Sequence, residues 1–114
     1  MSKFIPLSEP FLDKFDLNSV AKVIKNNWVS TAGKEINEFE SLVSKYTKSK
    51  YTVACINGTS ALHISLKIAG VKKNDEVIVP TLTFIAPINA VAYNNANPIF
   101  MDSDKYYNID TNKT

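Results

Sequence analysis

The sequence predicts an α/β fold with a parallel-rich sheet, on two observations. Short apolar segments of strand character alternate with segments of helical periodicity, and turn residues such as Asn57-Gly58 separate them. Strand, helix, strand, helix, strand at this spacing is typical of βαβ units, whose strands run parallel. Parallel sheets bind their ligands at the carboxyl ends of the strands. We therefore expect the functional residues to follow the strands directly.

This alternating pattern occupies the second half of the chain. The predicted strands cover residues 51–56, 76–79 and 99–101, and the predicted helices cover residues 59–69 and 84–93. Gly70 stops the first helix, because glycine readily adopts the backbone conformation that follows a helix end. Pro87 is acceptable in the second helix because it falls in the first turn, where its missing N–H costs nothing.

The first half has a different character. Residues 1–12 contain prolines and are expected to be extended, while residues 16–26 and 34–46 carry apolar side chains at helical spacing. The loop between these two helices begins with Trp28. We therefore expect an N-terminal helical arm over residues 1–33, followed by the first part of a larger domain over residues 34–114.

Composition excludes several classes of protein. The 114 residues carry a formal net charge of +2, with 13 basic and 11 acidic side chains, and no basic run typical of a nucleic-acid-binding arm. The single cysteine, Cys55, excludes an internal disulfide and is expected to be a small core residue in a protein of a reducing compartment. The lone histidine, His63, makes a metal site improbable and is expected to be structural and partly buried. No apolar stretch has the length of a membrane span, so a cytoplasmic protein is expected.

The sharpest local motif is Asn57-Gly58-Thr59-Ser60-Ala61, between a predicted strand and a predicted helix. Gly58 permits tight backbone geometry, and Thr59 and Ser60 offer hydroxyls beside the unpaired N–H groups of a helix start. Such a start binds phosphate readily. A plain helix N-cap explains the same residues, because Ser and Thr are common caps.

Two further motifs carry aromatic side chains. Phe84 closes the segment after the second predicted strand, where it either presents a ring to a flat ligand or packs as a core residue at a helix start. Trp28 precedes Ser30 and Thr31 in the first loop, where it either contacts a sugar or nucleotide or packs inside a helix–helix connection.

Taken together, six motifs in a fixed order resemble the start of the DegT/DnrJ/EryC1/StrS sugar aminotransferases. They are Ile5–Pro10, Trp28–Lys34, Phe39–Glu40, Asn57–His63, Asp75–Ala86 and Asn108–Asp110. The likeness covers essentially the whole chain and is strongest to the 4-aminotransferases of bacterial surface-sugar pathways, of the legionaminic-acid and perosamine kind. Pro87 departs from the pattern, since many relatives carry Thr there.

The resemblance implies an incomplete fold type I domain that binds pyridoxal 5′-phosphate, in a protein that forms a homodimer. In the family, the loop matching Gly58, Thr59 and Ser60 binds the cofactor phosphate, and the aromatic residue matching Phe84 stacks on the pyridine ring. Positions matching Ser30 and Thr31 lie near the substrate end of the site.

The implied reaction transfers an amino group, with glutamate as the expected donor, to a 4-keto nucleotide sugar used for surface polysaccharides. A sugar dehydratase of the same superfamily, with histidine in place of the catalytic lysine, is the alternative. A non-catalytic truncated relic or partner is a third interpretation. The family's covalent lysine and the carboxylate that pairs with the pyridine nitrogen fall beyond residue 114, so no catalytic residue is expected in this chain, and the chain alone is expected to be inactive.

Overall fold

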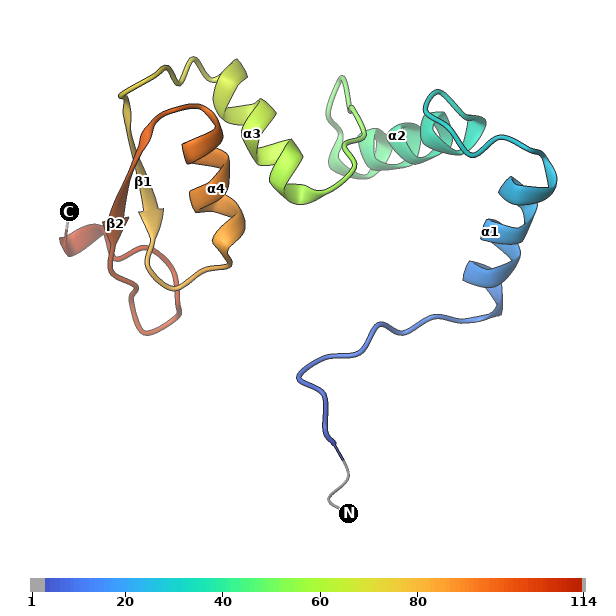
Figure 1. The fold of residues 1–114 in the computed structure, drawn as a ribbon, viewed down its shortest axis with the longest axis horizontal. Coiled ribbons are helices and arrows are strands. Elements are labelled where there is room, and N and C mark those ends of the chain that lie inside the picture. The colour runs from blue at the N-terminus through green and yellow to red at the C-terminus, as the bar shows by residue number, and fades with distance from the viewer. Residues whose placement is uncertain (1–3, 114) are drawn as a thin grey trace. The chain divides into compact units, whose positions relative to one another are not determined.

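The computed structural model describes residues 4–113, which form two compact units joined between Ala54 and Cys55. The first unit contains the helices α1 (Lys14–Lys25) and α2 (Lys34–Thr47). The second contains, in order, α3 (Gly58–Ile68), β1 (Glu76–Pro80), α4 (Ile85–Tyr93), β2 (Asn97–Met101) and the short 3-10 helix η1 (Thr111–Lys113) (Figure 1). The predicted domain division after residue 33 remains a prediction.

Helix α1 begins two residues earlier than its periodicity predicts, because two aspartates cap it. The Asp13 carboxylate accepts the N–H of Phe15 at 2.7 Å, and the Asp16 carboxylate accepts the N–H of Asp13 at 2.9 Å. This reciprocal arrangement satisfies N–H groups that a helix start leaves unpaired. The helix ends at Lys25 with Asn26 as its C-cap, and Asn27 follows in the left-handed conformation with φ 56°.

One predicted strand does not form among the described residues. Residues 51–55 pair with no other strand, although the N–H of Ala54 donates to the Glu40 carboxylate at 2.8 Å. A strand needs a partner for its backbone, and within the described chain β1 and β2 pair only with each other. Cys55 is consequently exposed, so its expected place in the core is wrong for this part of the chain.

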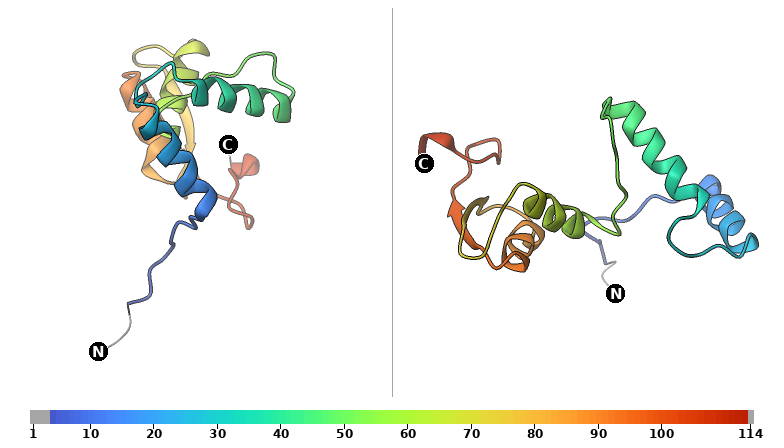
Figure 2. Two further views of the ribbon diagram at one scale, coloured as in Figure 1. Left: turned by 90° about the vertical axis from the view of Figure 1, so that its right-hand side faces the viewer. Right: turned by 90° about the horizontal axis from the view of Figure 1, so that it is seen from above.

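The second unit contains the predicted parallel βαβ arrangement. Strands β1 and β2 run parallel, with Ile78 opposite Ile99, and α4 forms the connection between them. Beyond β1, the N–H of Thr81 continues the pairing by donating to the carbonyl of Met101 at 2.9 Å. Both arrows point the same way in Figure 1, and α4 contacts both strands, as the views of Figure 2 also show.

The core of the second unit lies between the sheet and α4. Val79 of β1, Val91 of α4 and Ala96 before β2 are buried against one another, and Leu66 of α3 packs against this cluster. Burial of apolar surface here holds strand to helix without any ion pair. Helix α3 therefore joins the unit through its contact with α4.

Helix α3 ends at the predicted stop. Gly70 adopts φ 96°, its N–H donates to the carbonyl of Lys67 at 3.2 Å, and the N–H of Val71 donates to the carbonyl of Leu66 at 3.0 Å. This pair of bonds is the Schellman arrangement, which satisfies the last helical carbonyls. The side chain of Asn94 also donates to the carbonyl of His63 at 3.3 Å and so ties α3 to the end of α4.

The chain after β2 is an ordered turn. The Asp104 carboxylate accepts the N–H groups of Tyr106 at 2.8 Å and Asn108 at 3.0 Å. The Lys113 ammonium donates to Asp102 at 3.0 Å, and this hydrogen bond lowers the pKa of the Asp102 carboxyl and raises that of the Lys113 amine.

Among residues 4–113, no helix has both the length and the apolar character needed to cross a membrane.

Candidate functional site

The start of α3 shows which residue caps this helix. Asn57, with extended backbone, is the N-cap, and its side-chain oxygen accepts the N–H of Ser60 at 2.9 Å. Neither Thr59 nor Ser60 serves as the cap, and neither hydroxyl makes a hydrogen bond to another described residue. Both hydroxyls therefore remain free for a ligand. Asparagine caps helices as well as serine does, so this residue was the available sequence signal.

The backbone of the same turn offers two more donors. The N–H groups of Gly58 and Thr59 have no acceptor among the described residues, as expected for the first positions of a helix. A Cβ placed on Gly58 meets no atom within 4 Å, and the backbone there is not left-handed. The glycine is therefore not needed for tight backbone geometry, but it leaves open the space in front of the helix. Free donors, helix dipole and open approach together suit a phosphate.

Phe84 lies at the start of α4 rather than in a core. It is the N-cap residue of α4, and its side chain is 87% exposed. Packing inside the described part of the chain is thus excluded, and the ring is available to a flat ligand. The N–H groups of Ile85 and Ala86 are also unpaired, while Pro87 is the third residue of the helix and so lies in the first turn, as predicted. The sequence analysis did not identify these N–H donors at the start of α4. The strand–loop–helix pattern before Pro87 was the available signal, because a helix start leaves its first N–H groups unpaired.

These features gather where the fold class places ligands. Figure 1 shows the first turns of α3 and α4 toward the same end of the second unit as the arrowheads of β1 and β2. Thr81 holds that end together, since its N–H and hydroxyl both donate to the carbonyl of Met101, at 2.9 and 3.3 Å. The first turns of α3 and α4 therefore lie toward the end of the second unit at which the strands finish, where parallel sheets bind their ligands.

His63 lies one turn into α3 and packs against a residue of α4. Its ring is half-buried and packs edge-to-face on Tyr93, with ring centres 5.6 Å apart and an angle of 67°. The expectation of a partly buried histidine is confirmed. Aromatic pairs in this geometry stabilise the contact between two helices, here α3 and α4.

The loop of the first unit has its own geometry. Ser30 and Thr31 are exposed, and their hydroxyls make no hydrogen bond within the described chain. Trp28 is 53% exposed, and its ring lies so close to Gly33 that a Cβ there would come within 2.8 Å of Cδ1. The tryptophan thus packs on loop backbone and stays about half exposed. Thr31 lines neither of the two hollows beside it, and the substrate role of Ser30 and Thr31 remains a prediction.

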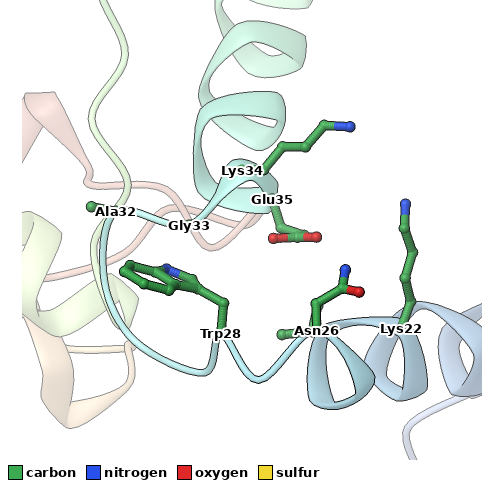
Figure 3. A pocket seen from close by; sticks show the side chains of 8 residues that line it. Lys22, Asn26, Trp28, Ala32, Gly33, Lys34 and Glu35 are labelled. Atoms are coloured by element: carbon green, nitrogen blue, oxygen red, sulfur yellow. The ribbon is translucent and has the colours of Figure 1, made fainter.

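Two hollows flank Trp28, of about 320 and 350 Å³. The smaller one appears in Figure 3, where the indole, the Glu35 carboxylate and the Asn26 amide surround one space. The larger one is lined in part by Val29 and Ser30. Volumes of this size lie at the lower end of the range for small-molecule sites.

Comparison with known proteins identifies the family. The family model described as the DegT/DnrJ/EryC1/StrS aminotransferase family matches residues 10–114. The chain belongs to this family. Its similarity to GDP-perosamine synthase of Escherichia coli O157:H7 is 41% identity over 102 residues, which is 90% of this chain and 28% of that protein.

Solved structures agree with this family and fold. The aminotransferase from Psychrobacter cryohalolentis is 33% identical with a TM-score of 0.78, over 96% of this chain and 30% of that one. NtdA from Bacillus subtilis, solved with the bound cofactor PMP, is 34% identical with a TM-score of 0.77, over 85% and 22%. The chain therefore spans less than a third of the length of these DegT/DnrJ/EryC1/StrS relatives, and its α/β architecture is part of their larger fold.

Proposed function

We propose that the protein carrying this chain is a pyridoxal-phosphate-dependent aminotransferase that transfers an amino group from glutamate to a 4-keto nucleotide sugar. The observation that carries this proposal is the open start of α3, because Asn57 performs the capping and leaves Thr59 and Ser60 unused. Membership of a sugar-aminotransferase family and likeness to a GDP-perosamine synthase support a nucleotide sugar as the substrate.

The described residues fit the phosphate and ring of the cofactor. The N–H groups of Gly58 and Thr59 and the hydroxyls of Thr59 and Ser60 donate to phosphate oxygens, and the space above Gly58 lets the anion approach. The exposed ring of Phe84 stacks on the flat heterocycle. When bound, the cofactor supplies the electron sink through which an amino group moves between two carbon skeletons.

Other parts of the reaction are assigned outside these residues. No lysine of this chain is given the covalent role, and we propose that this lysine and the partner of the ring nitrogen belong to the rest of the protein. The chain alone is then expected to show no turnover. Ser30 and Thr31 are proposed to contact the sugar, and the complete protein is proposed to act as a homodimer.

The test uses the complete protein with pyridoxal phosphate, glutamate and a 4-keto nucleotide sugar. We expect cofactor absorbance that glutamate changes, and an amino sugar as product. Phe84→Ala is expected to weaken cofactor binding about fivefold, since an aromatic stack contributes on the order of 1 kcal/mol. Tyr46→Ala, at a ring 90% exposed on α2, is the control and should leave binding unchanged.

Two results would contradict this proposal. Loss of water from the sugar without formation of an amino product would indicate the dehydratase alternative. A complete protein that neither binds the cofactor nor changes the sugar would indicate a non-catalytic relative.

A further inference from the structure

The hollow of about 320 Å³ beside Trp28 contains an unpaired carboxylate. Glu35, in the first turn of α2, is half-buried and makes neither an ion pair nor a hydrogen bond within the described chain. Its neighbour Lys34 pairs instead with Glu38 at 3.3 Å. A partly desolvated carboxylate without a donor costs free energy, so its natural complement is a ligand that brings N–H or O–H groups.

The other walls of this hollow restrict the shape and chemistry of that ligand. The indole of Trp28 lines the hollow, with its Cδ1–Nε1 edge held against Gly33, and supplies an aromatic ring for stacking. The side chain of Asn26 makes no hydrogen bond to another described residue, and in Figure 3 its amide and the Glu35 carboxylate point into the same space. Lys22 of α1 and Lys34 of α2 also line the hollow. The hollow therefore joins an aromatic ring, an acceptor, an amide and two positive charges.

A guanine base matches this set of groups. Its Watson–Crick edge carries two adjacent N–H donors, which a carboxylate accepts together, beside a carbonyl that an amide N–H reaches. Uracil has one such N–H between two carbonyls, and the carbonyls would face the Glu35 charge. The phosphates of a nucleotide carry negative charge, which the two lysines that line the hollow, Lys22 and Lys34, complement.

We propose that Trp28, Glu35 and Asn26 form a guanine-recognition site that selects a guanosine-diphosphate sugar as the substrate. This inference rests on the proposed function for the presence of a nucleotide sugar, and it adds the identity of the base. The larger hollow on the other side of Trp28, lined in part by Ser30, then lies next to the base site for the remainder of the ligand.

The test measures nucleotide binding to the complete protein by calorimetry, without amino donor. GDP is expected to bind about ten- to a hundredfold more tightly than IDP. IDP lacks the exocyclic amine and therefore loses one hydrogen bond to the charged Glu35 carboxylate. UDP is expected to bind more weakly than GDP. Glu35→Gln should abolish the preference for GDP over IDP. Glu76→Gln, at an exposed carboxylate of β1 that lines neither hollow beside Trp28, is the matched control and should keep it.

Equal binding of GDP and IDP, or tighter binding of UDP, by the unaltered protein would overturn the site, as would a Glu35→Gln variant that keeps the full preference. The comparison of nucleotides on unaltered protein needs no variant to fold. Failure of transamination with intact GDP selectivity would count against the proposed reaction alone, whereas active enzyme without base selectivity would count against this site alone.

Discussion

The close approach of Trp28 to Gly33 is the tightest constraint among the glycines. A Cβ at Gly33 would lie 2.8 Å from Cδ1 and 3.2 Å from Nε1 of the indole, well inside contact distance. The loop between α1 and α2 also contains Asn27 and Ala32 in left-handed conformations, so it has little freedom to shift. The indole therefore has to turn away if any side chain is added.

Gly33→Ala is expected to destabilise the protein by about 1–3 kcal/mol, the usual cost of forcing a group into a packed site. The measurement is urea unfolding of the complete protein freed of cofactor, so that cofactor binding does not contribute to the stability difference. Gly58→Ala is the matched control, because a Cβ there meets nothing within 4 Å. Its stability should be unchanged or raised by up to about 1 kcal/mol through better helix propensity. Equal losses for both variants would show that the indole does not lie on Gly33.

At the scale of elements, the bounds of α3 are set by the residues that cap its two ends. Asn57 caps its start through the N–H of Ser60, and Gly70 closes its end with φ 96°. These polar ends matter because the helix itself has only 11 residues and would be marginal in isolation. The cap also keeps the N-terminal donors oriented toward one point.

Asn57→Ala is expected to cost about 1 kcal/mol of stability, because the N–H of Ser60 then loses its acceptor. Asn57→Ser should retain most of that stability, since serine caps equally well. Asn37→Ala, within α2, serves as the control for removing an exposed amide. Thermal unfolding measures all three variants. If Asn57→Ser falls as far as Asn57→Ala, the side chain acts by something other than capping.

For the molecule as a whole, apolar exposure is the dominant feature of the described chain. Its buried hydrophobic residues are Val79, Ala90, Val91, Ala96 and Met101. Large apolar side chains remain exposed on each of the four α-helices, such as Leu17 at 69%, Leu42 at 68% and Ile68 at 81%. A parallel sheet is normally covered on both faces, and apolar patches of this extent mark surfaces that bind other protein.

The 114 residues expressed alone are therefore expected to self-associate or aggregate. Sedimentation should show species larger than a monomer, and a dye that binds apolar surface should fluoresce strongly. The complete protein is the comparison and should bind little of the dye. A monomeric 114-residue chain that melts cooperatively would contradict the expectation and show that these surfaces are stable in water.

Local pattern determined a large part of this protein from its sequence. Helical periodicity, the alternation of strand and helix, the stop at Gly70 and the tolerance of Pro87 all depend on neighbours within a few residues, so the chain alone specifies them. The six ordered motifs likewise placed the chain in its family.

Only the tertiary structure decided which of two roles several residues take. Three-dimensional geometry decides that Asn57 rather than serine caps α3 and that Phe84 is exposed. It also decides that Gly33 lies beneath Trp28 and that residues 51–55 pair with no strand. Most of them depend on which distant segments are present to cover a side chain or pair with a backbone. Sequence periodicity records that a residue can be buried or paired, whereas burial and pairing themselves require the partner to be in place.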